Sequence, residues 1–221
     1  MDSSQERLTH AQLRTPRAAA VAGILFSALL FVTFGLVRFS VPGDPFEPGA
    51  WLENGLLYVT LAMHLVPFAG VAFLWFMGVL RDRLGEREDQ FFSTVFLGSG
   101  LLLLAMLFSA AAVVGAIIIA FHDNPEALKH SATFHFGRGL AYGMINIYLL
   151  KTASAFMVTT STIALYTHLT PRWLAIGGYV VAIGLLIGSY YLDWSLLVFP
   201  LWVMSVSVSI LLEKEAGPGP S

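Results

Sequence analysis

A single lysine interrupts a long apolar stretch of the chain, in the run INIYLLKTASAF at residues 145–156. Lysine carries three N–H donors, and burying its ammonium in hydrocarbon costs a few kcal/mol or more unless it finds partners. Spacings of three and four residues place Lys151 on one helix face with Tyr148, Thr159 and Thr162. We predict that these polar side chains bind a small solute, an ion or a lipid group.

The sequence offers Lys151 no acidic partner, because every Asp and Glu belongs to a predicted loop, tail or helix end. Three hypotheses remain open for its ammonium. Desolvation can lower its pKa until it is neutral. A hydrated cavity can hold it with tyrosine, threonine and backbone oxygens. Alternatively, it meets an anion, a lipid headgroup or an acid on another subunit.

Histidines supply the second group of candidates. His64 lies in an apolar segment with Thr60 one turn before it and Pro67 three residues after it. Pro67 has no N–H and is expected to kink the helix, which exposes a carbonyl near the imidazole. We add His64 and Thr60 to the predicted ligand-binding residues. The candidate metal ligands are His64, His122, His130 and His135.

The spacing of these histidines indicates no particular cofactor. A chelating pair on one helix has its ligands three or four residues apart, whereas His130 and His135 are five apart. The sequence also lacks HExxH, Walker-type and dinucleotide glycine motifs, and it has no cysteine. We identify no catalytic residue and do not predict an enzyme.

Composition places the chain in a membrane. Of its 221 residues, 57% are hydrophobic and 12% are charged, and the mean hydropathy is +0.74. A soluble domain is closer to half apolar and a quarter charged, so the excess predicts a multi-pass protein whose first partner is the lipid bilayer. The net charge of −2 gives no basic surface for nucleic acid.

We predict an all-α bundle of six transmembrane helices, since about 20 apolar residues cross the hydrocarbon. The predicted spans are 18–39, 55–80, 91–121, 139–167, 172–191 and 194–212. The transmembrane domain covers residues 18–212 and includes an outer loop over 122–138. Asn124-Pro125 in that loop is expected to open a short interfacial helix. Residues 1–17 form an N-terminal segment and residues 213–221 a disordered tail.

Lysine and arginine placement sets the orientation. With the N-terminus inside, eight of these residues fall on the inner side and three on the outer side, apart from Lys151. This bias predicts that both termini are cytoplasmic and that the protein lies in the plasma (inner) membrane. Small residues at helical spacing predict close helix packing within one chain, with a homo-oligomer interface as the alternative. The pairs are Gly23 with Ser27, Ala111 with Gly115, Gly139 with Gly143, and Gly184 with Gly188.

The run FMGVLRDRLGEREDQFF, together with RTPRAAAVAG near the start, resembles bacterial multi-pass membrane proteins of unassigned activity. The resemblance covers the first half of the chain. It implies a membrane location and brings no site residues with it.

Three functions follow as hypotheses. The first is a binding or transport protein that uses the polar face around Lys151. The second is a non-catalytic subunit or assembly factor, in which Lys151 pairs with an acid on another membrane protein. The third is a redox or metal protein that uses the outer histidines.

Overall fold

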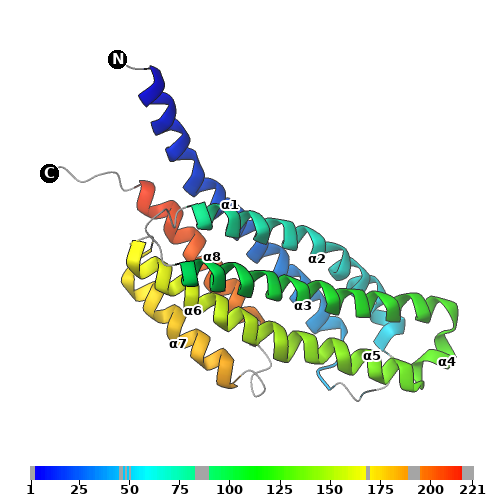
Figure 1. Ribbon diagram of the computed structural model, residues 1–221. Helices are drawn as coiled ribbons and strands as arrows, with labels where there is room; N and C mark the ends of the chain where they lie inside the picture. The colour runs from blue at the N-terminus through cyan, green and yellow to red at the C-terminus, as the bar shows by residue number, and fades with distance from the viewer. Residues whose placement is uncertain are drawn as a thin grey trace.

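The computed structural model describes residues 3–44, 47, 49, 51–82, 90–167, 170–188 and 195–215, and these ranges contain helices and no strands. The elements are α1 (Ser3–Ser40), α2 (Trp51–Asp82), α3 (Gln90–Asp123), α4 (Pro125–Lys129), α5 (Ala132–Gly143), η1 (Met144–Leu149), α6 (Leu150–Thr167), α7 (Arg172–Gly188) and α8 (Ser195–Glu215). The long helices pack as a bundle (Figure 1). The start of α1 and the end of α8 lie at one end, and α4 lies at the other. The predicted all-α class is confirmed.

Four of the described helical segments are long and apolar enough to cross a membrane, namely Ala18–Ser40, Trp51–Arg81, Phe91–Asp123 and Ser195–Leu212. The predicted fourth span is divided between α5, the π-helix η1 and α6. The predicted fifth span is α7, an apolar helix of 17 residues, or about 26 Å. The apolar helices are consistent with a membrane protein.

Helix ends differ from the prediction in three places. α1 is continuous from Ser3, so most of the predicted N-terminal segment is helical. The predicted outer loop is also mostly helical. α8 continues to Glu215, and the rest of the predicted tail, 216–221, lies outside the described residues.

Five phenylalanines from five helices form the centre of the bundle. Phe26, Phe73, Phe96, Phe156 and Phe199 are each at most 1% exposed. The ring centroids of Phe26 and Phe73 are 4.6 Å apart, those of Phe73 and Phe156 5.1 Å, and those of Phe96 and Phe156 5.0 Å. Within a bilayer, lipid is as apolar as these rings, and close packing rather than exclusion of water would then hold them together.

Glycines allow close helix contact at positions that the sequence only partly identified. A Cβ at Gly23 would collide with Ser207 Oγ and the Phe76 ring, so α1, α2 and α8 meet closely there. Gly178 plays the same part on α7 and was not predicted. The Cβ positions of four predicted packing glycines face open space instead: Gly115, Gly139, Gly143 and Gly184.

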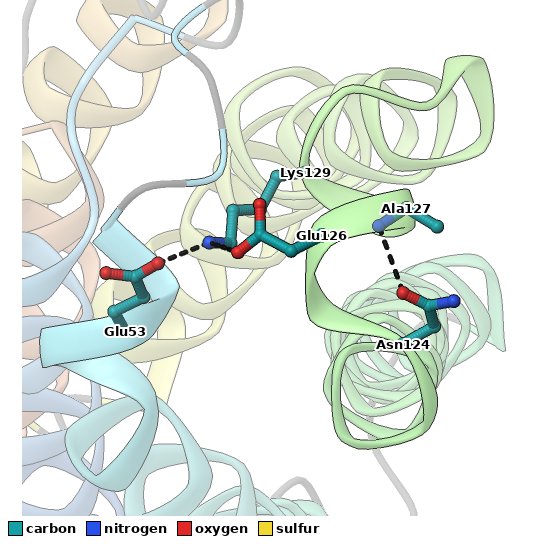
Figure 2. A network of polar contacts seen from close by, with 5 residues as sticks. All are labelled: Glu53, Asn124, Glu126, Ala127 and Lys129. Carbon is teal, nitrogen blue, oxygen red and sulfur yellow. Dashed lines mark hydrogen bonds and ion pairs between the residues drawn. The ribbon is translucent and has the colours of Figure 1, made fainter.

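The chain reverses direction at α4, where polar caps begin the next helices. Asn124 Oδ1 accepts from the Ala127 N–H at 3.1 Å, and Pro125 occupies the first turn, as Asn124-Pro125 predicts. Lys129 Nζ donates to Glu126 Oε1 at 2.8 Å and also to Glu53 Oε1 on α2 (Figure 2). This buried lysine therefore holds α4 against the first turn of α2.

Candidate functional site

Lys151 lies against the end of α7. Its Nζ donates to the backbone oxygen of Leu186 at 3.1 Å, and α7 ends two residues later at Gly188. Carbonyls in the last turn of a helix have no partner within that helix and attract cations. The ammonium thus finds the backbone-oxygen partner that one of the three hypotheses required. The residue is exposed, and it does not line the cavity between α1, α2, α3 and the α5–η1 segment that is described below.

The hydroxyl groups of the predicted polar face serve helix packing. Thr162 Oγ1 and the Tyr179 hydroxyl are 2.5 Å apart, so this pair and Lys151 both join α6 to α7. Thr159 is buried and donates to Ala155 O within its own helix at 2.8 Å. At 100° per residue, Thr159 is rotated about 80° from Lys151. The predicted face is therefore divided between the α7 contact and the core.

Tyr148 precedes α6 in the π-helix η1, and it is 59% exposed. It takes no part in the contacts that Lys151 and Thr162 make with α7.

His64 is exposed on α2, and its Nδ1 is 2.7 Å from Thr60 O, one turn earlier. The two predicted residues of α2 are thus neighbours, but neither lines the cavity between α1, α2, α3 and the α5–η1 segment.

The four histidines proposed as metal ligands are dispersed. His64 lies within α2 and His122 in the last turn of α3. His130 follows α4 and His135 is in the first turn of α5. Within the described ranges, no three His, Asp or Glu side chains form a group that could hold a metal ion.

A cavity of about 200 Å³ lies between α1, α2, α3 and the α5–η1 segment. One part of its lining is polar and includes Arg38, Trp51, Arg138, Tyr142 and Asn146. The rest is largely aliphatic and aromatic, and typical members are Phe34, Val59, Met63, Val66, Leu107 and Ala110. The cavity is therefore amphipathic.

Arg138 is anchored at this cavity by several contacts. It is 7% exposed. Its Nη2 donates to Pro42 O at 2.9 Å and to Asp44 O at 2.5 Å, while Nη1 donates to Glu47 O at 2.5 Å. The guanidinium carbon is also 5.6 Å from the centre of the Trp51 ring. Arg138 thus joins α5 to the connection between α1 and α2.

The charge of Arg138 is retained despite its burial. Burial disfavours the charged guanidinium, and the carboxylates of Glu47 and Asp44 favour it. The ordinary pKa of arginine is so high that the group remains protonated near neutral pH. Trp51 also lines the cavity, and its Nε1 is buried and has no hydrogen-bond partner among the described residues.

The π-helix η1 continues the wall of the cavity. Ile145 and Asn146 lie in η1 and line the cavity, and Asn146 Nδ2 donates to Tyr142 O at 3.1 Å. Single π-turns inside helices are frequent at functional sites. In α2, Pro67 cannot donate to the carbonyl of Met63, another lining residue.

Sequence reasoning did not select Arg138, Trp51 or Asn146. Arg138 was counted only as an outer-side positive charge. A signal was present, because Arg138 is the only Asp, Glu, Lys or Arg between residues 132 and 150. Its partners, Pro42, Asp44 and Glu47, lie more than 90 positions away in the chain, and no local pattern indicates such a pairing.

No protein family, curated protein or solved structure matches the chain.

Proposed function

We propose that this chain is an integral membrane protein that binds a small amphipathic molecule in the cavity between α1, α2, α3 and α5–η1. The observation that supports this proposal is the lining, which combines a buried arginine with a largely apolar wall. Binding pockets typically combine a mostly hydrophobic lining with a few placed polar groups.

The size of the cavity suits part of a small molecule. An apolar cavity of 150 Å³ in another protein accommodates benzene, and this one measures about 200 Å³. A ring, or a chain segment of similar size, therefore fits. A longer molecule must extend past the rim.

We propose six spans with both termini on the cytoplasmic side. The α5, η1 and α6 segments follow one another without a gap and supply a fourth span, while α7 supplies a fifth with modest thinning of the bilayer. The distribution of lysine and arginine favours this orientation. In this arrangement the cavity belongs to the outer half of the bundle.

In this topology Lys151 meets α7 near the outer end of that helix. Leu186 is about 21 Å along α7 from Arg172 on the inner side, and the ammonium meets α7 at that level. We propose that Lys151 fixes the end of α7. The neighbouring exposed Tyr148 favours a second candidate function, in which this edge contacts another membrane subunit.

A pair of alanine variants on α3 tests the binding proposal. Ala111 lines the cavity, whereas Ala112 is exposed on the outside of the same helix. Wild-type, Ala111→Leu and Ala112→Leu proteins would be isolated in nanodiscs, and their bound small molecules would be extracted and identified by mass spectrometry. We expect a molecule that wild type and Ala112→Leu retain and Ala111→Leu loses. Equal retention by all three proteins would contradict the proposal.

A further inference from the structure

The charged residues that line the cavity are both cations. Arg38 and Arg138 line it, and no acidic residue does so within the described part of the chain. The carboxylates that act electrostatically on Arg138 are those of Asp44 and Glu47. Both residues are exposed and lie outside the lining of the cavity. An anion inside the cavity would therefore meet positive charge and no direct repulsion from a lining carboxylate.

The N–H donors of Arg138 and Trp51 outnumber the acceptors that the described residues offer them. A guanidinium has five N–H donors, and three of them are used in bonds to described residues. Two N–H groups of Arg138 therefore remain without a described acceptor. The indole N–H of Trp51, beneath the same guanidinium, is a third such donor. The Trp51 N–H is buried, and a buried donor without an acceptor is costly. The site is therefore suited to a group that only accepts.

Carboxylate and phosphate oxygens are such acceptors, and their bonds to arginine are charge-assisted. The apolar wall behind the arginines, formed by residues such as Val59, Val66 and Leu107, offers no comparable polar partner and is suited to hydrocarbon.

Trp51 also lines a second pocket between α1 and α2, together with Phe39, Asn54 and Tyr58. Phe39 is 89% exposed and Tyr58 51% exposed. A hydrocarbon chain too long for the cavity thus has an apolar surface on which to continue past Trp51.

We propose that the cavity binds a single-chain amphiphile with an oxyanion head, a carboxylate or a phosphate monoester, whose head contacts Arg138 and Trp51 and whose chain lies along the apolar wall. This inference rests on the proposed function and specifies the class of ligand.

Three probes with the same twelve-carbon chain separate the head group from the chain. Dodecanoate, dodecyl phosphate and dodecanol would be titrated into the full-length protein in phosphatidylcholine nanodiscs, and bound probe would be counted by native mass spectrometry. Empty nanodiscs correct for partitioning into lipid. We expect at least one anionic probe to bind about tenfold or more tightly than dodecanol, since a charge-assisted hydrogen bond has that effect. The anion that binds better identifies the head group.

Two variants assign the head group to its partners. Arg138→Gln should abolish the preference for the anionic probes over dodecanol. Trp51→Phe preserves the aromatic ring beneath Arg138 and should weaken anion binding about threefold to tenfold. This second variant keeps the test decisive if Arg138→Gln does not fold.

The outcomes distinguish the two proposals. If dodecanol binds as tightly as both anions, and Ala111→Leu abolishes all binding, the head-group inference fails and the proposed function stands. If Ala111→Leu binds every probe as wild type does, the cavity is not the binding site and both proposals fail. Unchanged anion binding by Trp51→Phe would overturn the role of the indole N–H.

Discussion

Replacing Arg138 with methionine removes a guanidinium while keeping an unbranched side chain. In the native protein this group donates to the backbone oxygens of Pro42, Asp44 and Glu47 and lies over the ring of Trp51. The substitution should therefore release the connection between α1 and α2 from α5. We predict a large loss in the free energy of unfolding.

The magnitude follows from the surroundings of each bond. A hydrogen bond from a charged donor contributes about 1.5–3 kcal/mol. Asp44 and Glu47 are exposed, so water can replace part of their bonds, whereas Pro42 is half-buried. The contact with Trp51 adds about 1 kcal/mol. Removing a desolvated charge returns part of this loss, and we expect Arg138→Met to lose about 2–4 kcal/mol.

The assay is equilibrium unfolding in mixed micelles with increasing sodium dodecyl sulfate, together with hydrogen exchange of the amides near Asp44. Arg172→Met is the matched control, because Arg172 is exposed at the start of α7. A change at such a surface position should be within about 0.5 kcal/mol. If both variants lose the same free energy and exchange near Asp44 stays slow, the reasoning about Arg138 is wrong.

Three further predictions concern the helix contacts. Lys151→Met should lose about 1 kcal/mol of unfolding free energy, since it removes the cation at the end of α7. Lys151→Arg should retain that free energy. Equal losses in the two variants would contradict a stabilising contact between Lys151 and the end of α7. The hydrogen bond to Lys129 lowers the pKa of Glu126, and the bond to Glu126 raises that of Lys129. The stabilisation by this pair should therefore be lost as pH falls below the ordinary carboxyl value of 4.5 or rises above the ordinary lysine value of 10.5. Melting temperatures should show a smaller acid-side loss in Glu126→Gln, in which Lys129 keeps only Glu53, and an unchanged loss would contradict the pairing. Gly178→Ala should lower the free energy of unfolding by about 1–3 kcal/mol through overpacking. The Cβ position of Gly184 faces open space, so Gly184→Ala should leave that free energy unchanged or raise it by up to about 1 kcal/mol in a denaturant titration.

Local signals predicted the features that depend on neighbouring residues. The apolar segments indicated the helices because hydropathy is a property of a continuous stretch. Asn124 and Pro125 correctly predicted the start of α4, since a cap acts within one turn. The prediction that Lys151 and Thr159 share one polar face was less successful. The difference of about 80° between Lys151 and Thr159 follows from helical geometry alone, but which side faces α7 depends on packing.

The cavity required information that a linear pattern does not contain. The partner of Lys151 is a backbone oxygen whose availability depends on where α7 ends. The site around Arg138 brings together Trp51 and Asn146 from segments far apart in the chain. The π-turn in η1 also has no simple composition signal. Arg138 was recognisable as an isolated charge, but its burial follows only from the arrangement of the helices.

Photolabelling tests the central claim, a ligand-binding cavity, most directly. A dodecanoate with a diazirine near the end of its chain would be irradiated with the protein in nanodiscs, and the labelled residues would be located by peptide mass spectrometry. We predict labels on the apolar wall, at residues such as Val59, Val66 and Leu107, with loss of these labels in Ala111→Leu. Labels confined to exposed outer positions such as Val180 and Ile187 on α7 would contradict the account.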